Sequence, residues 1–572
     1  MKTKYMILPL VALGIAVTSC KDDMDYHEYS IVDKDFIEKN FGNVGGFMTD
    51  LYNTVEYDFG NFSSGAMQAA ATDEAEYSKI GNSIEDFYNG GWTPTNAKST
   101  NWTNMYTGIQ SANHYIDFFQ GLKFEDYELN PDYAQQMYRY ENYVYEARFL
   151  RAYYYFVLVR QYGGVPLIDH QMAAGEVNTM SRNTSDEIYE FIIKECDEIK
   201  DKIIRNYADL GSMALGQTES GRAGKIAVLA LRARAALYWA SPLFNPNGDK
   251  ERYKKAADYY KDLFDECQYQ GKGLTAKYSN LWDANSFNDP AIDKELLFCR
   301  RYYKSASGDN LVETNNYPVG IEGGTGGTCP TQNLVDAYDM LNGKSINEAG
   351  SGYDPKNPYA NRDPRLAATV AVNGDVWPSY QKNKLQTYYG GTNGQPLSGA
   401  TTTGYYLKKL CNGAIDLSAS SKYKESRHTY LNFRYGGALL DYAEAVYQYT
   451  GSADVTLPGH TMTARQAVNQ VRNRAGMPDV TETGDAFWTK YQNERFVELA
   501  FEGHRFWDVR RWKEGKKFFT TITRMNITKN ADGSFTYNPQ QVSRQWDERN
   551  NLFPIPQTEI SKNGNLVQNP GW

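Results

Sequence analysis

The chain has 572 residues and a net charge of -9, and 41% of its residues are hydrophobic while 23% are charged. This balance is that of an ordinary globular protein, and the length allows a large core and more than one domain. Because no long run of Lys and Arg is present to neutralise phosphates, nucleic acid is excluded as the main partner.

The first residues have the features of a secretory signal. Two lysines precede an apolar stretch at 5–17 that is too short to span a bilayer, and small residues follow it up to Cys20. This pattern resembles a bacterial lipobox, in which the cysteine becomes the acylated first residue; an ordinary signal peptide with an incidental cysteine is the alternative. We predict a lipoprotein signal peptide at 1–19, and lipid attachment and a linker at 20–40.

Acylation of Cys20 would hold the protein firmly at a membrane, because stable anchoring requires more than one lipid chain and bacterial lipoproteins carry several. The next residues, Lys-Asp-Asp at 21–23, resemble the export signal of Bacteroidetes lipoproteins that reach the cell surface. No later apolar segment is long enough to span a bilayer. We therefore predict a lipid-anchored protein of the outer membrane that faces the outside of the cell.

Helical periodicity dominates both ends of the chain. The stretch 143–161 has two apolar stripes at spacings of three and four residues, which is typical of a helix covered on two sides. The stretch 221–240 is similar and rich in alanine, so neighbouring helices can approach it closely. Further helices are predicted at 101–120, 184–203, 251–268, 435–450, 463–475 and 485–512. Successive helices of this kind indicate helical pairs like those of tetratricopeptide repeats.

The middle of the chain, from 271 to 430, is dense in Gly, Ser, Thr, Asn and Pro. Helical periodicity is lost there, apart from one predicted helix at 331–341, and short runs such as 295–300 have the character of strands. We predict a mainly α protein with one domain at 41–572. In it, a helical frame at 41–270 and 431–572 holds a loop-rich insert at 271–430.

Three segments of the chain carry distinctive motifs: ARFLRAYYYFVLVRQYGGVPL, NFRYGGALLDYAEAVYQ and NERFVELAFEGHRFWDVRRW. They resemble motifs of the SusD/RagB family of outer-membrane nutrient-binding lipoproteins. The matches occur in the family's order along the chain, at 147–167, 362–366, 432–448, 468–478, 493–512 and 552–572. The insert matches least.

The resemblance implies a tetratricopeptide-like helical frame and a binding protein without catalytic activity. It implies a SusC-like TonB-dependent outer-membrane barrel as the partner that receives the ligand. The ligand implied for most members is a glycan, while some relatives bind peptides. A polysaccharide-active enzyme is the least favoured alternative.

The residues themselves also argue against an enzyme. Glu494 and Glu498 lie four apart on one predicted helix, a separation that an acid/base pair of a glycosidase can have. Flanking arginines would keep both carboxyls ionised, so we interpret them as ion pairs that lock the frame. No H-E-x-x-H motif and no G-x-S-x-G elbow is present.

The sequence predicts no cofactor and no metal site. The run at 245–249 places oxygen ligands at alternate positions, but the glycine and glutamate of a calcium loop are missing, and a turn is the better interpretation. A structural calcium ion is thus left without support. The five cysteines other than Cys20 are far apart with no C-x-x-C spacing, which favours buried thiols and leaves one isolated disulfide open.

A glycan site requires exposed aromatic rings beside amide, carboxylate or guanidinium groups on loops. The segment GGWTPTNAKSTNW at 90–102 has this character, with Trp92, Asn96 and Trp102 as candidate ligand-binding residues. It also matches the loop ahead of the first repeat, which in the SusD branch supplies aromatic and Asn ligands. The alternative for Trp102 is packing into the helix that begins beside it.

The insert supplies the second set of candidates, because it places aromatic rings and arginines in loop-like surroundings. The predicted ligand-binding residues there are Trp282, Arg300, Tyr303, Tyr317 and Trp377.

Overall fold

The structure is a computed structural model, and it describes residues 38–99, 101–173, 175–207, 210, 221–282, 293–304, 311–418 and 426–572. The predicted signal peptide and lipidation site at Cys20 lie outside the described residues. Within the described ranges, no helix is both long enough and apolar enough to cross a membrane.

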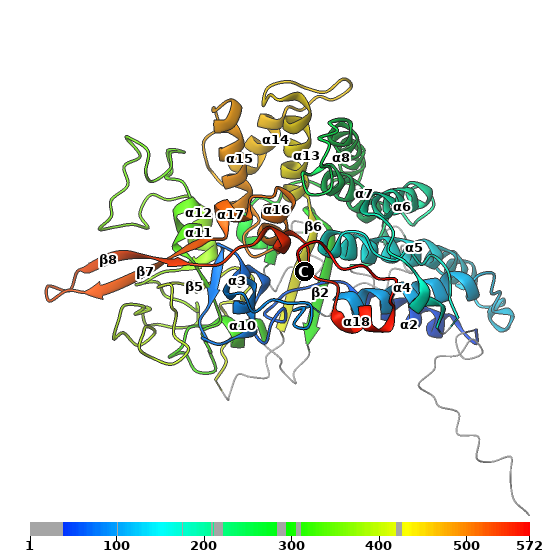
Figure 1. Cartoon of the computed structure of the whole chain (residues 1–572), viewed down its shortest axis with the longest axis horizontal. Helices are drawn as coiled ribbons and strands as arrows, with labels where there is room; N and C mark the ends of the chain where they lie inside the picture. Colours follow the sequence, from blue (N-terminus) through cyan, green and yellow to red (C-terminus); the bar gives the residue numbers. More distant parts are fainter. Residues whose placement is uncertain are drawn as a thin grey trace, which may run out of the picture.

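The fold is mainly helical, as the periodicity predicts. Each helix of the frame packs against the next along the chain, so that the helices from α4 to α8 and then α13 and α14 form an arc (Figure 1). The frame helices are α2 (Phe41–Leu51), α4 (Asn101–Phe118), α5 (Tyr133–Tyr162), α6 (Ser185–Ile199), α7 (Lys225–Ala240), α8 (Glu251–Tyr269), α13 (Tyr435–Thr450), α14 (Ala464–Arg474), α15 (Gly484–Glu498) and α16 (His504–Arg511).

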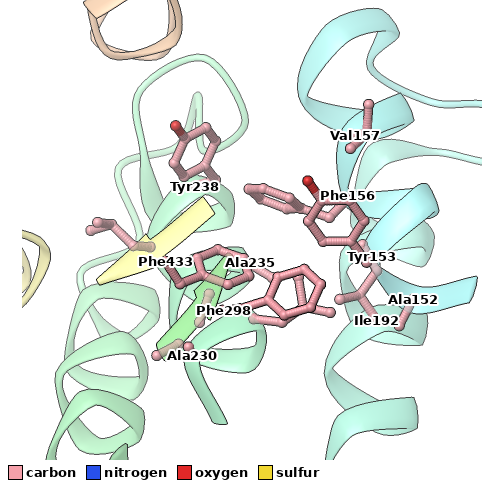
Figure 2. Close-up of a cluster of buried hydrophobic side chains, with 14 of the residues drawn as sticks. Ala152, Tyr153, Phe156, Val157, Ile192, Ala230, Ala235, Tyr238, Phe298 and Phe433 are labelled. Atoms are coloured by element: carbon pink, nitrogen blue, oxygen red, sulfur yellow. The ribbon is translucent and has the colours of Figure 1, made fainter. Parts of the chain in front are cut away.

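Helices α5 and α7 form the centre of the frame. The second half of α5 is buried on nearly every side, as its two apolar stripes predict. The alanines of α7 let this helix approach α5 and α6. Aromatic rings of α5 and α7, such as Tyr153 and Tyr238, gather around Phe298 and Phe433 (Figure 2). Burying one such side chain contributes about 1.5–3 kcal/mol, so this cluster fixes the frame.

The frame and the insert meet at a pair of long strands. Strand β2 (Leu296–Lys304) runs antiparallel to β6 (Ser426–Arg434), and Arg300 lies opposite Tyr430 in the ladder. The other paired strands are β1 (Ala75–Tyr77) with β3 (Thr328–Pro330), β4 (Val370–Ala371) with β5 (Tyr406–Leu407), and β7 (Thr521–Lys529) with β8 (Phe535–Ser543).

The β7–β8 hairpin projects from the body of the molecule at the end opposite helix α6 (Figure 1). It interrupts the C-terminal region, which the sequence analysis assigned wholly to the helical frame. Residues alternate in the second half of β7, where Met525 and Ile527 are buried and the polar residues between and beyond them are exposed; Ile522 is buried as well. Short helices complete the fold: α3 (Asp86–Asn89), α10 (Leu311–Asn316), α11 (Gln332–Ala337), α12 (Pro364–Thr369), α17 (Gly515–Phe518) and α18 (Gln557–Lys562).

The prediction of a single helix at 485–512 is wrong, because a turn separates α15 from α16. Phe501 and Gly503 both adopt positive φ angles, of 61° and 76°. A left-handed phenylalanine costs roughly 1–2 kcal/mol, which surrounding contacts must offset. The buried carboxylate of Glu502 supplies such contacts, since it accepts hydrogen bonds from Arg434 at 2.7 Å and from Lys409 at 2.7 Å.

Glu494 and Glu498 lie in a buried ion-pair network, as the structural interpretation predicts. Glu498 contacts Arg434 of β6 at 2.7 Å and Arg365 of α12 at 2.9 Å. Although burial alone would raise the pKa of Glu498, the surrounding guanidiniums hold it well below its usual range. The network therefore joins the helical frame to the insert.

Candidate functional site

A pocket of about 580 Å³ opens where the frame, the insert strands and the segment after α2 meet. Its lining mixes aromatic rings with side-chain amides, hydroxyls and charged groups. The lining residues are Asn53, Thr54, Val55, Glu56, Tyr57, Asp58, Asn61, Phe62, Gln68, Lys98, Ser99, Asn101, Asn104, Met105, Arg160, Arg234, Tyr238, Arg300, Tyr430, Asn432, Glu502, Gly503, His504 and Trp507.

One wall of the pocket is the turn at 53–62. The Asp58 carboxylate accepts the backbone N–H of Gly60 at 3.1 Å and that of Gln68 at 2.6 Å, which closes the turn. Burial raises the pKa of Asp58 to about 6, against the lowering effect of these hydrogen bonds. The turn presents Tyr57 and Phe62 as half-buried rings.

Polar groups of α7, β6 and α16 also face the pocket. The hydroxyls of Tyr238 and Tyr430 and the indole N–H of Trp507 line it and have no hydrogen-bond partner among the residues that the structure describes. The Tyr238 hydroxyl points away from the packed rings of Phe298 and Phe433 (Figure 2). These groups are therefore available to a ligand.

His504 lies beside them in its neutral form. Burial, followed by the guanidiniums of Arg234 and Arg495, holds the pKa of His504 well below its usual range. Its Nδ1 lies 3.4 Å from Nη2 of Arg495.

The charged groups of the pocket are paired within the protein. Arg160 forms an ion pair with Glu56, and the Arg160 guanidinium lies 4.6 Å from the centre of the Trp507 ring. Asn101 donates to the other Glu56 oxygen at 3.2 Å. Arg234 Nε lies 3.1 Å from a carboxylate oxygen of Asp441.

Arg300 is the predicted insert residue that does line this pocket. Its guanidinium lies 4.2 Å from the centre of the Tyr57 ring, and Nη1 donates to the backbone carbonyl of Asn53 at 2.9 Å. The same nitrogen donates to the carbonyl of Val55. Arg300 thus holds the wall at 53–62 against strand β2.

The first predicted loop reaches the pocket through residues other than those named. Trp92 is only 2% exposed, so the expectation of an exposed ring there is wrong. Its ring packs against Phe553 and Trp572, with centroid distances of 4.6 Å and 4.9 Å. The buried indole instead anchors the loop, and its N–H donates to the carbonyl of Ala97 at 3.3 Å.

Trp102 and Asn96 also hold the loop inward. Trp102 is buried and packs edge-on against Tyr162, as the helix-packing alternative proposed. Asn96 donates to Asp86 at 3.0 Å and to the carbonyl of Gly91 at 2.8 Å. As a result, Lys98, Ser99 and Asn101 of this loop are its contribution to the pocket.

Three of the remaining candidates in the insert do not line the pocket. Trp282, Tyr317 and Trp377 are buried in the core of the insert, so the expected exposed rings are absent at these positions. Tyr317 donates its hydroxyl to the carbonyl of Asn412 and packs against Trp377 at 5.9 Å. The backbone of Tyr303 belongs to β2, while its side chain lies outside the described part of the structure.

The sequence analysis missed most residues of the pocket, among them Tyr57, Tyr430 and Trp507. A signal for Tyr57 was present in YDFGNF at 57–62, which interleaves rings with Asp, Asn and Gly in a loop. Tyr430 and Trp507 carried no such signal, because a strand and a helix bring them to the pocket. Their role follows from tertiary structure alone.

No group of three or more His, Cys, Asp or Glu side chains in the described ranges is arranged to hold a metal ion. The segment 245–249 is a turn, in which Asn245 accepts the backbone N–H of Asp249 at 3.0 Å. Cys196, Cys267, Cys299, Cys329 and Cys411 are free and buried.

Comparison with known proteins identifies the family of this chain. The family profile described as "SusD family" matches residues 294–572, and one described as "Starch-binding associating with outer membrane" matches residues 33–236. The chain belongs to the SusD/RagB family.

Among individual proteins, the SusD-like protein P2 of Formosa agariphila is 26% identical over 487 residues, covering 82% of this chain and 80% of its own. A SusD-like protein of Bacteroides fragilis has the same fold with a TM-score of 0.77 at 23% identity, covering 95% of this chain and 99% of its own. A surface glycan-binding protein A of Bacteroides fluxus is similar with a TM-score of 0.60 at 20% identity, covering 93% and 99%.

Proposed function

We propose that this protein binds a glycan in the pocket described above and delivers it to a TonB-dependent outer-membrane transporter. The observation that carries the proposal is the pairing of half-buried rings with unpartnered hydroxyl and indole groups in one pocket, beside side-chain amides. A sugar ring has an apolar C–H face and a rim of hydroxyls, so it requires both kinds of group at once.

The lining residues divide into two roles under this proposal. Tyr57 and Phe62 offer ring faces for stacking near the exposed amides of Asn53 and Asn61. Deeper in the pocket, Trp507 offers an N–H donor to a sugar hydroxyl. The charged pairs orient these groups and contact the ligand less directly.

The proposal is binding without turnover. Glu56 and Glu502 line the pocket, and each accepts hydrogen bonds from basic side chains. Asp58 has both oxygens engaged by backbone N–H groups. A general acid requires a carboxyl free to deliver its proton to the ligand, and these three are occupied otherwise.

The cellular part of the proposal rests on the lipobox-like sequence at Cys20, on the family and on its outer-membrane description. Acylated at Cys20, the protein would sit on the outer surface and pass its ligand to a SusC-like barrel. Replacing Cys20 by Ala should release the protein from the membrane fraction. Protease treatment of intact cells should degrade the wild-type protein, and full protection of a membrane-bound wild-type protein would contradict the surface assignment.

Affinity electrophoresis tests the binding function. The protein without residues 1–20 would be run in gels containing plant, host or fungal polysaccharides, beside a Tyr57→Ala variant. We expect one polysaccharide class to retard the wild type, and the variant to lose up to about tenfold in affinity, because an aromatic contact contributes about 0.5–1.5 kcal/mol.

Tyr269→Ala is the matched control, since Tyr269 is a 70% exposed ring that does not line the pocket. Retardation unaffected by Tyr57→Ala would move the site elsewhere. If no polysaccharide retards the protein, and peptides protect it from thermal unfolding instead, the ligand would be a peptide and not a glycan.

A further inference from the structure

We infer that the glycan bound in this pocket is uncharged, carrying free hydroxyls but neither carboxylate nor sulfate groups. The inference rests on the proposed function and specifies its ligand. It follows from how the charges of the pocket are already used, and from which groups are left over.

The charged side chains that line the pocket have partners in the protein. Arg160 is paired with Glu56, and Lys98 with Asp86. Glu502 contacts both Arg434 and Lys409 at 2.7 Å, and Arg234 contacts Asp441 at 3.1 Å.

The two remaining charged residues bind the main chain. The carboxylate of Asp58 accepts backbone N–H groups, while the guanidinium of Arg300 donates to backbone carbonyls. One is an acid and the other a base, so they add no net charge to the lining.

The groups left for a ligand are neutral. They are the hydroxyls of Tyr238 and Tyr430, the indole N–H of Trp507 and the uncharged imidazole of His504. Hydroxyls both donate and accept, and the indole donates. This mixture complements sugar hydroxyls, which also donate and accept.

Every cation that lines the pocket, among the residues that the structure describes, is already engaged within the protein, so an anionic ligand would have to displace a partner. A carboxylate or sulfate that enters the pocket loses its hydration, and recovers it only if a guanidinium or ammonium turns to it. Here that requires either a pair such as Arg160–Glu56 to open, which would leave the Glu56 carboxylate unpaired, or Arg300 to release the backbone carbonyls that it holds. The cost falls on acidic glycans alone, so the pocket discriminates against them.

Ligand pairs that differ only in charge test this inference by isothermal titration calorimetry. Oligogalacturonide and alginate fragments would be compared with their carboxyl-reduced forms, and a sulfated galactan fragment with its desulfated form, beside neutral glucan, mannan and xylan oligosaccharides. We expect binding to be confined to neutral members, with any acidic counterpart at least about tenfold weaker. Affinity should change little between 50 and 500 mM NaCl.

Trp507→Phe and Tyr430→Phe connect the preference to the pocket. Tyr430→Phe keeps its ring and removes only the hydroxyl, while Trp507→Phe replaces the indole by a smaller aromatic ring without the N–H. Each should weaken binding of the neutral ligand about three- to tenfold, as the loss of one hydrogen bond predicts. Tyr138→Phe, at a ring 55% exposed, is the control.

Tighter binding of an acidic member, weakened by salt and by these variants, would overturn the inference and leave glycan capture intact. Binding of none of these glycans or those of the wider panel would instead overturn the proposed function, and the inference with it.

Discussion

Glu74 shows how a single buried residue supports the pocket from outside it. Its Oε1 accepts the backbone N–H of Phe501, in the turn that brings His504 to the pocket. Burial raises the pKa of Glu74 from an ordinary value of 4.5 to about 8, against the lowering effects of this hydrogen bond and of Lys409. The carboxyl is therefore protonated in the folded protein at neutral pH.

This raised pKa predicts a stability that depends on pH. A group that binds its proton more tightly when folded stabilises the protein fully below the unfolded pKa, and this stabilisation is lost as the pH rises through the folded pKa. The free energy of unfolding should therefore fall between pH 6 and 8, by at most about 1.4 kcal/mol per pH unit for one proton.

Glu74→Gln should flatten that decline, because glutamine keeps the acceptor oxygen and does not ionise. Urea unfolding followed at several pH values measures it. Asp58, with a pKa raised to about 6, has the same sign, so the comparison is made above pH 6. An equal decline in wild type and variant would show that Glu74 does not titrate in this range.

Also at the scale of residues, the sequence analysis chose aromatic residues beside amides and misjudged which of them were exposed. Trp92, Trp282 and Trp377 have the residue type of a sugar platform, yet all are buried. Large rings contribute most to a core, and a loop that must be fixed in place uses them as anchors. Exposure depends on distant partners such as Trp572, which no local pattern contains.

At the scale of elements, the loop at 90–101 is positioned by its buried tryptophan. Trp92→Ala would remove the contacts with Phe553 and Trp572 and leave a cavity, so we expect a loss of about 3–5 kcal/mol in the free energy of unfolding. Chemical denaturation measures this loss. Tyr389→Ala, at a ring 71% exposed, should cost little.

Any loss of glycan binding in Trp92→Ala would arise through movement of Lys98, Ser99 and Asn101. A variant as stable as the wild type that simply fails to bind would contradict this structural role, and would return Trp92 to the list of ligand contacts.

The link between frame and insert depends on the carboxylate of Glu498. Its partners Arg365, Arg434 and Arg474 come from α12, β6 and the end of α14. Glu498→Gln leaves buried guanidiniums without their anion, and breaking such a pair costs about 3–5 kcal/mol.

Thermal or urea unfolding measures the effect of Glu498→Gln, and the exposed Glu128→Gln is its control. A loss in the free energy of unfolding no larger than that of the control would show that the ion pairs of Glu498 do not stabilise the fold.

For the whole molecule, the sequence predicted the class of fold and most frame helices, because helical periodicity and small-residue contacts are local signals. The predicted helices at 251–268 and 463–475 match α8 and α14 within a residue or so. The break between α15 and α16 was missed because it depends on the buried contacts of Glu502. The hairpin at 521–543 was missed because the family frame was extended over it.

The pocket also depends on the fold of the whole molecule. Its lining comes from segments as distant as Asn53 and Trp507, which are brought together by the β2–β6 ladder and the ion-pair network. Among the predicted site residues whose side chains the structure describes, only Arg300 lines it. The fold positions a site that is built from so many elements. This explains why sequence patterns identified so few of its residues.

The most direct test of this account is a crystal structure of the protein without residues 1–20, bound to an oligosaccharide of the class that the binding screen selects. The account predicts a sugar ring in the pocket, stacked near Tyr57, with a hydroxyl within hydrogen-bond distance of Trp507 Nε1. An oligosaccharide bound instead on the insert, with the pocket empty, would contradict the central claim.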